Sequence, residues 1–309
     1  MTVFEQQLLA DFEWCVASSE LIELPINFFQ QVDRTEFLKP LLELISNQPE
    51  QVISKLSDSL GLLKTKRLGD RFEQFWFTAF DIHPNYQILT RNFAIRDKGR
   101  TLGELDLVIQ DLTGRCFHLE LSCKFYLSYV VGNQIYWFGP GLADRLDKKV
   151  NRIIQHQLPI GHHPIAVQKV ADIVGFPVDE FEKNYSSHSI LRGRCYQPIN
   201  NIVEQEYASV EDIEPNNAVT NNLWGTSNEW LKFMANQNDM DEMCRWRFLD
   251  KVEWFAKVIP KGNEVTAEQF FNRTIDYPKA IVAFNGQDEF LRGFWVEDDW
   301  REKATGSIK

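Results

Sequence analysis

Hydrophobic and polar residues alternate along two neighbouring stretches of the chain, between Gly103 and Lys124. Such alternation is typical of β-strands, because successive side chains point to opposite faces of a sheet. Leu112-Thr113-Gly114 separates the two stretches as a short turn, so the sequence predicts a β-hairpin. Asp106 on the first strand and Glu120 on the second each fall on the face opposite the regular apolar set. We therefore expect two carboxylates on neighbouring strands.

Other parts of the chain show helical spacing or strand-like runs. Apolar residues recur at helical spacing over residues 3–16, 36–60, 68–80 and 143–158. Strand-like runs cover residues 86–95 and 189–199, and a final hairpin is expected to turn at Asn285-Gly286. Pro159 is expected to end the helix that begins at residue 143. The central order of helix, three strands, helix and strand predicts the α/β class, with helices packed on a mixed sheet.

The length of 309 residues is large for a single core. We expect an N-terminal helical cover over residues 1–63, a core over residues 64–200, and a C-terminal extension over residues 201–309 packed on that core. Residues 200–222 are acidic and rich in Asn, which is typical of a linker or a long loop. Beyond them, two helices are expected to carry Trp224, Trp230, Trp246 and Trp254.

The composition argues against several classes of protein. No apolar run reaches the roughly eighteen residues that a transmembrane helix needs. The N-terminus is acidic and amphipathic, and it lacks the basic region and apolar block of a signal peptide. The five cysteines are scattered and form no Cys-x-x-Cys pair, which argues against a disulfide framework or a zinc ribbon. A reducing compartment, the cytoplasm, is therefore expected.

Charge is distributed unevenly along the chain. The net charge of −11 is unusual for a protein that binds nucleic acid, but residues 64–100 hold eight basic and four acidic residues. This basic segment lies directly before the hairpin, where it could line a groove that follows phosphate groups. Its basic residues are Lys64, Lys66, Arg67, Arg71, Arg91, Arg96, Lys98 and Arg100. The alternative is a solvated face whose basic side chains pair with acidic neighbours.

The two hairpin carboxylates are candidates for a metal site. Lys124 lies further along the strand, on the same face as Glu120. Two acids and a lysine in this arrangement suit a hard divalent cation such as Mg²⁺ or Mn²⁺. Glu73 lies on the predicted helix 68–80, beside its apolar stripe. The plain alternatives are the solvated face of an ordinary hairpin, an ion pair of Asp106 with a neighbouring arginine, and a helix-edge position for Glu73.

The order of elements and the positions of the acids resemble the PD-(D/E)xK nuclease superfamily. That superfamily has a restriction-endonuclease-like αβββαβ core with an acid on the first helix, an Asp on the second strand and Glu-x-Lys on the third. These positions match Glu73, Asp106 and Glu120. The chain more closely resembles the bacterial family called domain of unknown function 1853, which has been grouped with the superfamily by its motifs. Six segments carry this resemblance in order: LGDRFEQFWFTAF, GELDLVIQD, LELSCKFYL, FGPGLADRLDKKVNRIIQHQL, LRGRCYQP and RGFWVEDDW.

The resemblance implies a metal-dependent phosphodiesterase that acts on DNA or RNA. Asp106, Glu120 and the carbonyl of Leu121 would bind one Mg²⁺ or Mn²⁺ ion, and Glu73 would contact it directly or through water. Lys124 would stabilise charge on the phosphate or orient the attacking water. The expected substrate-binding residues are Arg67, Arg71, Arg91, Arg100 and Gln155.

The lysine position departs from the superfamily pattern. The residue two places after Glu120 is Ser122, and the lysine follows at Lys124. Four strand residues span about 13 Å and two span about 7 Å, so Lys124 would have to reach back unless a bulge shortens the gap. Residues on the following helix are the alternatives: Lys148, Lys149 and Gln155.

Two classes of function therefore remain open. The first is the phosphodiesterase, and the second is a non-catalytic nuclease-fold protein that binds a protein or nucleic-acid partner. Convergence of the three acids and a lysine around an open cleft would favour the enzyme. Burial of the same residues in mutual salt bridges would favour the binding protein.

Overall fold

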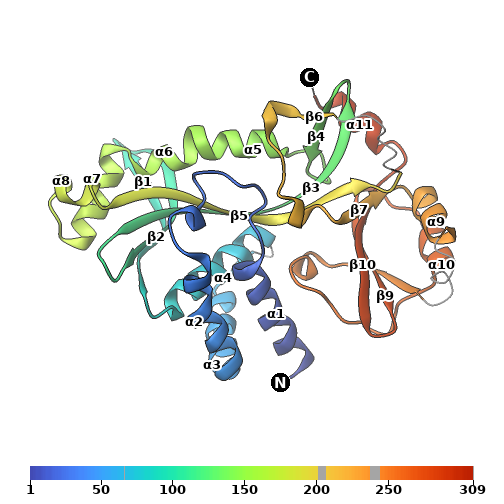
Figure 1. The fold of residues 1–309 in the computed structure, drawn as a ribbon, viewed down its shortest axis with the longest axis horizontal. Helices are drawn as coiled ribbons and strands as arrows, with labels where there is room; N and C mark the ends of the chain where they lie inside the picture. Colours follow the sequence, from blue (N-terminus) through green and yellow to red (C-terminus); the bar gives the residue numbers. More distant parts are fainter. Residues whose placement is uncertain (66, 201–206, 237–243, 309) are drawn as a thin grey trace. The chain divides into compact units, whose positions relative to one another are not determined.

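The computed structural model describes residues 1–65, 67–200, 207–236 and 244–308 (Figure 1). Lys66, from the basic segment, and residues 201–206 of the expected linker lie outside this part of the chain. The chain forms two compact units, one of residues 1–123 and 150–192, the other of residues 124–149 and 193–309. The division into three successive segments stays a prediction. The protein is of the mixed α/β type, with several helices and a large mixed sheet.

The first unit holds the predicted hairpin. Its strands follow one another in the order β1 (Tyr86–Asp97), β2 (Arg100–Asp111), β3 (Cys116–Val131) and β5 (Tyr185–Pro198), of which β3 and β5 continue into the second unit. β2 pairs antiparallel with both β1 and β3, which confirms the hairpin (Figure 1). Asp111 stabilises its turn, because its carboxylate accepts hydrogen bonds from the main-chain amides of Thr113 and Arg115.

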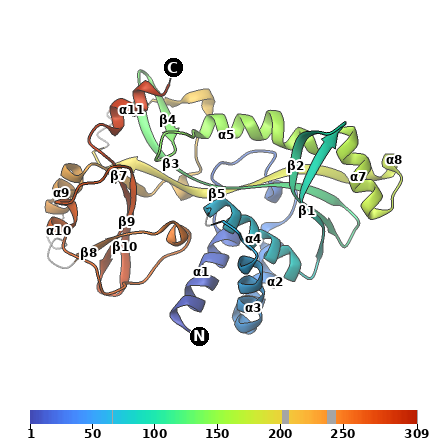
Figure 2. The ribbon, with the colours of Figure 1, turned by 180° about the vertical axis from the view of Figure 1, so that it is seen from behind.

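Four helices at the start of the chain pack together in the first unit. They are α1 (Val3–Ala17), α2 (Arg34–Asn47), α3 (Pro49–Gly61) and α4 (Leu68–Ile82), and α4 also packs against β1 and β2 (Figure 2). The single helix predicted over residues 36–60 is wrong, because it is interrupted at Gln48. Pro49 begins the second helix, where its missing N–H costs nothing. Phe28 joins these helices to the sheet through ring contacts with Phe37, Phe80 and Phe117.

The helix predicted over residues 143–158 is present but continues past its expected end. It consists of α5 (Leu146–Arg152), the π-helical turn η2 (Ile153–Gln157) and α6 (Leu158–Gly161). Pro159 does not end it and instead occupies the first turn of α6. The prediction was wrong because a proline is tolerated where the residues before it form a wider turn than an α-helix.

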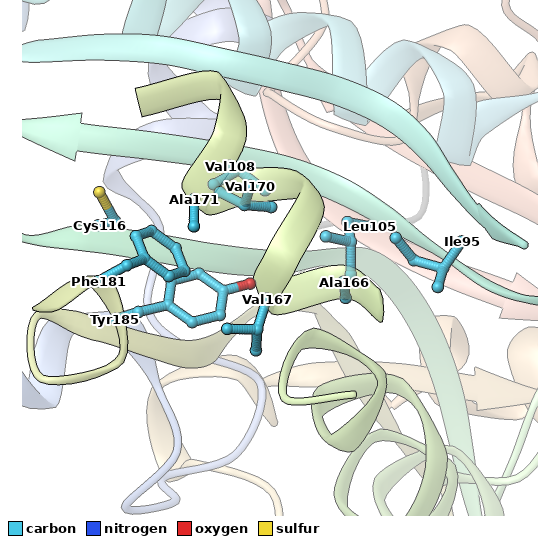
Figure 3. Packing of buried hydrophobic residues seen from close by; sticks show 10 residues of the cluster. All are labelled: Ile95, Leu105, Val108, Cys116, Ala166, Val167, Val170, Ala171, Phe181 and Tyr185. Carbon is cyan, nitrogen blue, oxygen red and sulfur yellow. The ribbon is translucent and has the colours of Figure 1, made fainter. Parts of the chain in front are cut away.

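Helix α7 (Pro164–Val174) packs on the sheet of the first unit, and α8 (Val178–Glu182) follows it. Figure 3 shows the buried cluster between α7, α8 and the strands. Its members are Ile95, Leu105, Val108, Cys116, Ala166, Val167, Val170, Ala171, Phe181 and Tyr185. This apolar layer fixes β1 and β2, which carry one side of the candidate site.

The second unit contains the remaining strands and helices. Its elements are β4 (Gln134–Phe138), β6 (Ala208–Ser209), β7 (Asn222–Gly225), α9 (Ser227–Ala235), β8 (Cys244–Phe248), α10 (Ala267–Phe271), β9 (Lys279–Asn285), β10 (Asp288–Trp295) and α11 (Trp300–Gly306). β5, β7, β10, β9 and β8 are successive neighbours, with β7 parallel to β5 and β10. The hairpin that turns at Asn285-Gly286 is confirmed.

The expected positions of the four tryptophans are largely wrong. Only Trp230 lies on a helix, α9, whereas Trp224 lies on β7 and Trp246 on β8. Trp254 follows a short 3₁₀ turn. These segments are short, and other side chains enclose them. The spacing of their apolar residues therefore does not distinguish a buried strand from a helix. No helix among the described residues is long and apolar enough to cross a membrane.

Candidate active site

Asp106 and Glu120 lie on adjacent antiparallel strands, as the sequence predicts. The pairing of β2 with β3 ends at Leu107 and Leu119, and the two acids are the next residues of their strands beyond this pair. Beyond that pair, the Asp106 side chain hydrogen-bonds to the main chain of β3: its Oδ2 accepts a hydrogen bond from the amide of Leu121 at 2.9 Å. This bond directs the Asp106 carboxylate towards the residues of β3 that follow Glu120.

Glu120 is buried, with only 3% of its surface exposed. A carboxylate withdrawn from water needs hydrogen-bond donors to offset its lost hydration. Nε2 of Gln157, the last residue of the π-helical turn, donates to Oε2 of Glu120 at 2.5 Å. The segment after the sheet therefore supplies a neutral donor to the second acid of the hairpin.

Glu73 lies on α4, close enough to Asp106 for their charges to interact. Burial, together with the charges of Asp106, Asp70 and Glu104, raises the pKa of Glu73 from 4.5 to about 7. A carboxyl group with this pKa exchanges a proton readily near neutral pH, which is a property of general acids and bases. The α4 helix thus brings a third acid into the electrostatic neighbourhood of the hairpin pair.

The strand on the other side of Asp106 is irregular. Arg91 of β1 pairs with Leu107 and Phe93 pairs with Leu105, so Asn92 stands opposite Asp106. Asn92 has a φ of 49°, in the left-handed region that asparagine tolerates better than most residues. The β1 backbone therefore departs from regular strand geometry at Asn92, next to the residues that pair with both neighbours of Asp106.

The acids do not form a complete three-ligand cluster. Within the described part of the chain, no three His, Cys, Asp or Glu side chains are grouped so that they could hold one metal ion. The expected donors are the carboxylates of Asp106 and Glu120, which lie on adjacent strands, and the carbonyl of Leu121. Mg²⁺ commonly binds through one or two carboxylates and keeps several waters, so these donors fit a hydrated divalent cation.

Lys124 belongs to the second unit, where its ammonium has an acidic partner. Nζ of Lys124 lies 2.8 Å from Oδ2 of Asp144, and about a third of each side chain is exposed. The hydroxyl of Tyr126 donates to the same carboxylate at 3.4 Å. The contribution of Lys124 to a site at Asp106 and Glu120 stays a prediction.

The predicted substrate-binding residues lie in different settings. Arg71 is partly buried, with Nη2 3.5 Å from Oδ2 of Asp11 and its guanidinium over the ring of Phe75. Arg91 is exposed, and its guanidinium lies 5.4 Å from the ring centre of Phe77. The other three are exposed: Arg67, Arg100 and Gln155. Arg71 thus contributes to packing, whereas the exposed residues remain accessible to a ligand.

A cavity of about 530 Å³ lies beside β1 in the first unit. Residues 86–91 of β1 form one side, and Phe80 and Asp81 at the end of α4 form the other. Arg91 lines it and pairs, through its main chain, with the residue next to Asp106. The lining of this hollow does not include Glu73, Asp106 or Glu120.

Sequence reasoning missed Gln157 and selected Gln155 instead. Gln155 is exposed, whereas Gln157 reaches Glu120. The signal that could have distinguished them is Pro159, because a proline within a continuing helix indicates an irregular turn before it.

One comparison with known proteins identifies a family. A family model described as "Domain of unknown function (DUF1853)" matches residues 10–281. No match was found among curated proteins or among solved structures.

Proposed function

The chain belongs to this family of unknown function, whose description names no activity, and we propose that it is a metal-dependent phosphodiesterase of the nuclease type. Its substrate would be DNA or RNA, and its metal Mg²⁺ or Mn²⁺. The proposal agrees with the resemblance of Glu73, Asp106 and Glu120 to the acidic positions of the PD-(D/E)xK superfamily.

The observation that carries the proposal is the position of Asp106 against β3. Asp106 and Glu120 follow directly after the last paired residues of β2 and β3, and the Leu121 amide donates a hydrogen bond to the Asp106 carboxylate. Two carboxylates and one carbonyl therefore come from two adjacent strands, within a hairpin that its own turn stabilises. Rigid strands position ligands more reproducibly than loops do.

The chemistry divides between the cation and the side chains. A bound Mg²⁺ or Mn²⁺ would polarise the phosphate and make an attacking water more acidic. Asp106 and Glu120 would hold the cation, and the Glu73 carboxylate would accept the proton that the water loses. The water oxygen forms a bond to phosphorus, the bond from phosphorus to the leaving sugar oxygen breaks, and that oxygen takes up a proton from solvent. Hydrolysis would thus give a phosphate monoester and an alcohol.

Basic side chains would bind the phosphate backbone. Arg67, Arg91 and Arg100 are exposed in the first unit and would contact phosphates as charged donors. Lys124 would stabilise charge on the phosphate, with Lys148 and Lys149 as the alternatives.

A second reading, a non-catalytic protein that binds a protein or nucleic acid, also has an observation in its favour. Ser122 occupies the usual lysine position, and the ammonium of Lys124 is already paired with Asp144. A site that lacks a lysine at the phosphate could bind metal and nucleic acid without cleaving.

Cleavage of a mixed panel of single- and double-stranded DNA and RNA in Mn²⁺ tests the two readings. The wild-type chain should cleave at least one substrate, and Asp106→Asn should abolish the activity. Glu13→Gln removes one charge from an exposed position of α1 and should cleave like the wild type. Retained binding without cleavage by the wild type would favour the second reading.

A further inference from the structure

The π-helical turn before α6 has a local cause in the sequence. In an α-helix, the ring of Pro159 would collide with the carbonyl of residue 155, and its missing N–H would leave that carbonyl unbonded. The chain instead widens here, since the amide of Leu158 donates to the carbonyl of Ile153, five residues back. The wider turn lets the helix continue to Gly161.

The last residue of this turn, Gln157, contacts one of the hairpin acids. Ile154, Gln155 and His156 are exposed, whereas Gln157 is partly buried and its amide contacts Glu120. A π turn adds a residue to the helix and so rotates the side chains that follow it. Such turns are rare and occur frequently at functional sites.

The chemistry of the contact suits a cation ligand. A glutamine amide donates to a carboxylate without neutralising its charge, unlike arginine or lysine. Glu120 is 3% exposed, so the donor from Gln157 restricts its orientation more than the same contact would at the surface. Groups that orient the ligands of a metal commonly contribute 10–100-fold to its affinity, an order-of-magnitude range.

We propose that Gln157 is a positioning residue that holds the Glu120 carboxylate for a divalent cation, and that the π turn at Ile153–Gln157 directs it there. The part of this inference that concerns a cation rests on the proposed function. The part that concerns the hydrogen bond between Gln157 and Glu120, and its origin in the π turn, is independent of that function.

Mn²⁺ binding to the full chain, measured by titration calorimetry, tests the proposal. Gln157→Met keeps the length of the side chain and removes the donor, and should weaken binding about 10–100-fold. Pro159→Ala should weaken it in the same direction, because it removes the cause of the π turn. Gln51→Met, the same substitution at an exposed position of α3, should bind like the wild type.

The outcomes separate this inference from the proposed function. If the wild type binds Mn²⁺ and Gln157→Met binds it equally well, the positioning role is wrong. Loss of affinity in Gln155→Met, with Gln157→Met unaffected, would assign the role to Gln155 instead. If the wild type binds no Mn²⁺, the proposed function and the cation both fail.

A second measurement needs no metal. In a nitrogen-15 spectrum of the side-chain amides, the Gln157 resonance should shift strongly in Glu120→Gln, and that of Gln51 should not. An unshifted Gln157 resonance would show that the contact is not made in solution and would overturn the proposal. Thermal unfolding of each variant confirms that the fold is retained.

Discussion

Arg192 and Glu20 meet in the interior of the first unit, with Nη1 of the arginine 2.6 Å from Oε1 of the glutamate. The guanidinium also lies over the rings of Phe29 and Trp76, and none of its surface is exposed. Burial raises the pKa of the Glu20 carboxyl, while Arg192 and the amide of Leu191 oppose that rise. Each charge therefore depends on the other to remain ionised away from water.

Removal of one member of this pair should destabilise the protein strongly. Arg192→Met leaves a carboxylate buried without its cation, and the free energy of unfolding should fall by about 3–5 kcal/mol. The double variant Glu20→Gln/Arg192→Met should recover part of the lost unfolding free energy. Urea denaturation of the single and the double variant measures these changes. Lys55→Met breaks an exposed pair with Asp81, so a loss as large as that of Arg192→Met would contradict this explanation.

Gly161 should not tolerate a side chain. A Cβ there would overlap the hydroxyl of Ser187 and the ring of His118, which are themselves 3.1 Å apart. Gly161→Ala should lower the free energy of unfolding by about 1–3 kcal/mol, as overpacking does. Gly61→Ala, in open space at the end of α3, should cost nothing. Adding Ser187→Ala to Gly161→Ala should restore part of the loss, and no restoration would point to another cause.

Glu73 should make the stability of the metal-free protein depend on pH. Its pKa is about 7 in the folded protein, and its ordinary value of 4.5 applies to the unfolded chain. Between these values the folded state binds more protons, so this group's contribution makes the protein less stable as pH rises through the window. Glu73→Gln should remove that fall and should unfold at higher urea than the wild type at about pH 8. Glu13→Gln should keep the wild-type dependence.

Mn²⁺ should raise the unfolding temperature, because the folded ligands bind it and the unfolded chain does not. At about one hundred times the dissociation constant, the gain in unfolding free energy should be about 2.7 kcal/mol. Asp106→Asn should remove the gain. An equal rise in Asp106→Asn would place the metal elsewhere on the chain.

Lys124 should be needed for cleavage and not for metal binding. Lys124→Ala should abolish cleavage while the affinity for Mn²⁺ stays unchanged. Lys124→Arg should keep only part of the cleavage activity, since a planar guanidinium group replaces the compact charge of an ammonium group. Cleavage at the wild-type rate by Lys124→Ala would assign the role to another residue. Lys148→Ala and Lys149→Ala are the next variants to measure.

The hairpin acids could be predicted from the sequence because strand alternation and turn residues act locally. The alternation between Gly103 and Lys124 predicts both strands, and the structure confirms that Asp106 and Glu120 lie on neighbouring ones. The assignment of Trp224 and Trp246 to helices failed because both lie in short buried strands. In such segments packing by the rest of the unit, and not periodicity, decides the conformation.

The partner of Glu120 could not be predicted from helical spacing. Pro159 was expected to end the helix, and the π turn that accommodates it shifts the inward glutamine to Gln157. The break at Gln48 within residues 36–60 has a similar origin in a proline, Pro49, which begins a new helix. Both differences come from backbone adjustments that a regular 3.6-residue period does not contain.

The turn at Asp111 has a consequence for the order of folding. Its carboxylate binds the amides of Thr113 and Arg115, so the hairpin closes over a short loop. Loop closure costs less entropy for contacts close in sequence, and such contacts form sooner. We therefore expect Asp106 and Glu120 to come together early, while the longer closure that brings Gln157 to Glu120 follows. During folding, Asp106 and Glu120 would therefore come close together before Gln157 forms its hydrogen bond with Glu120.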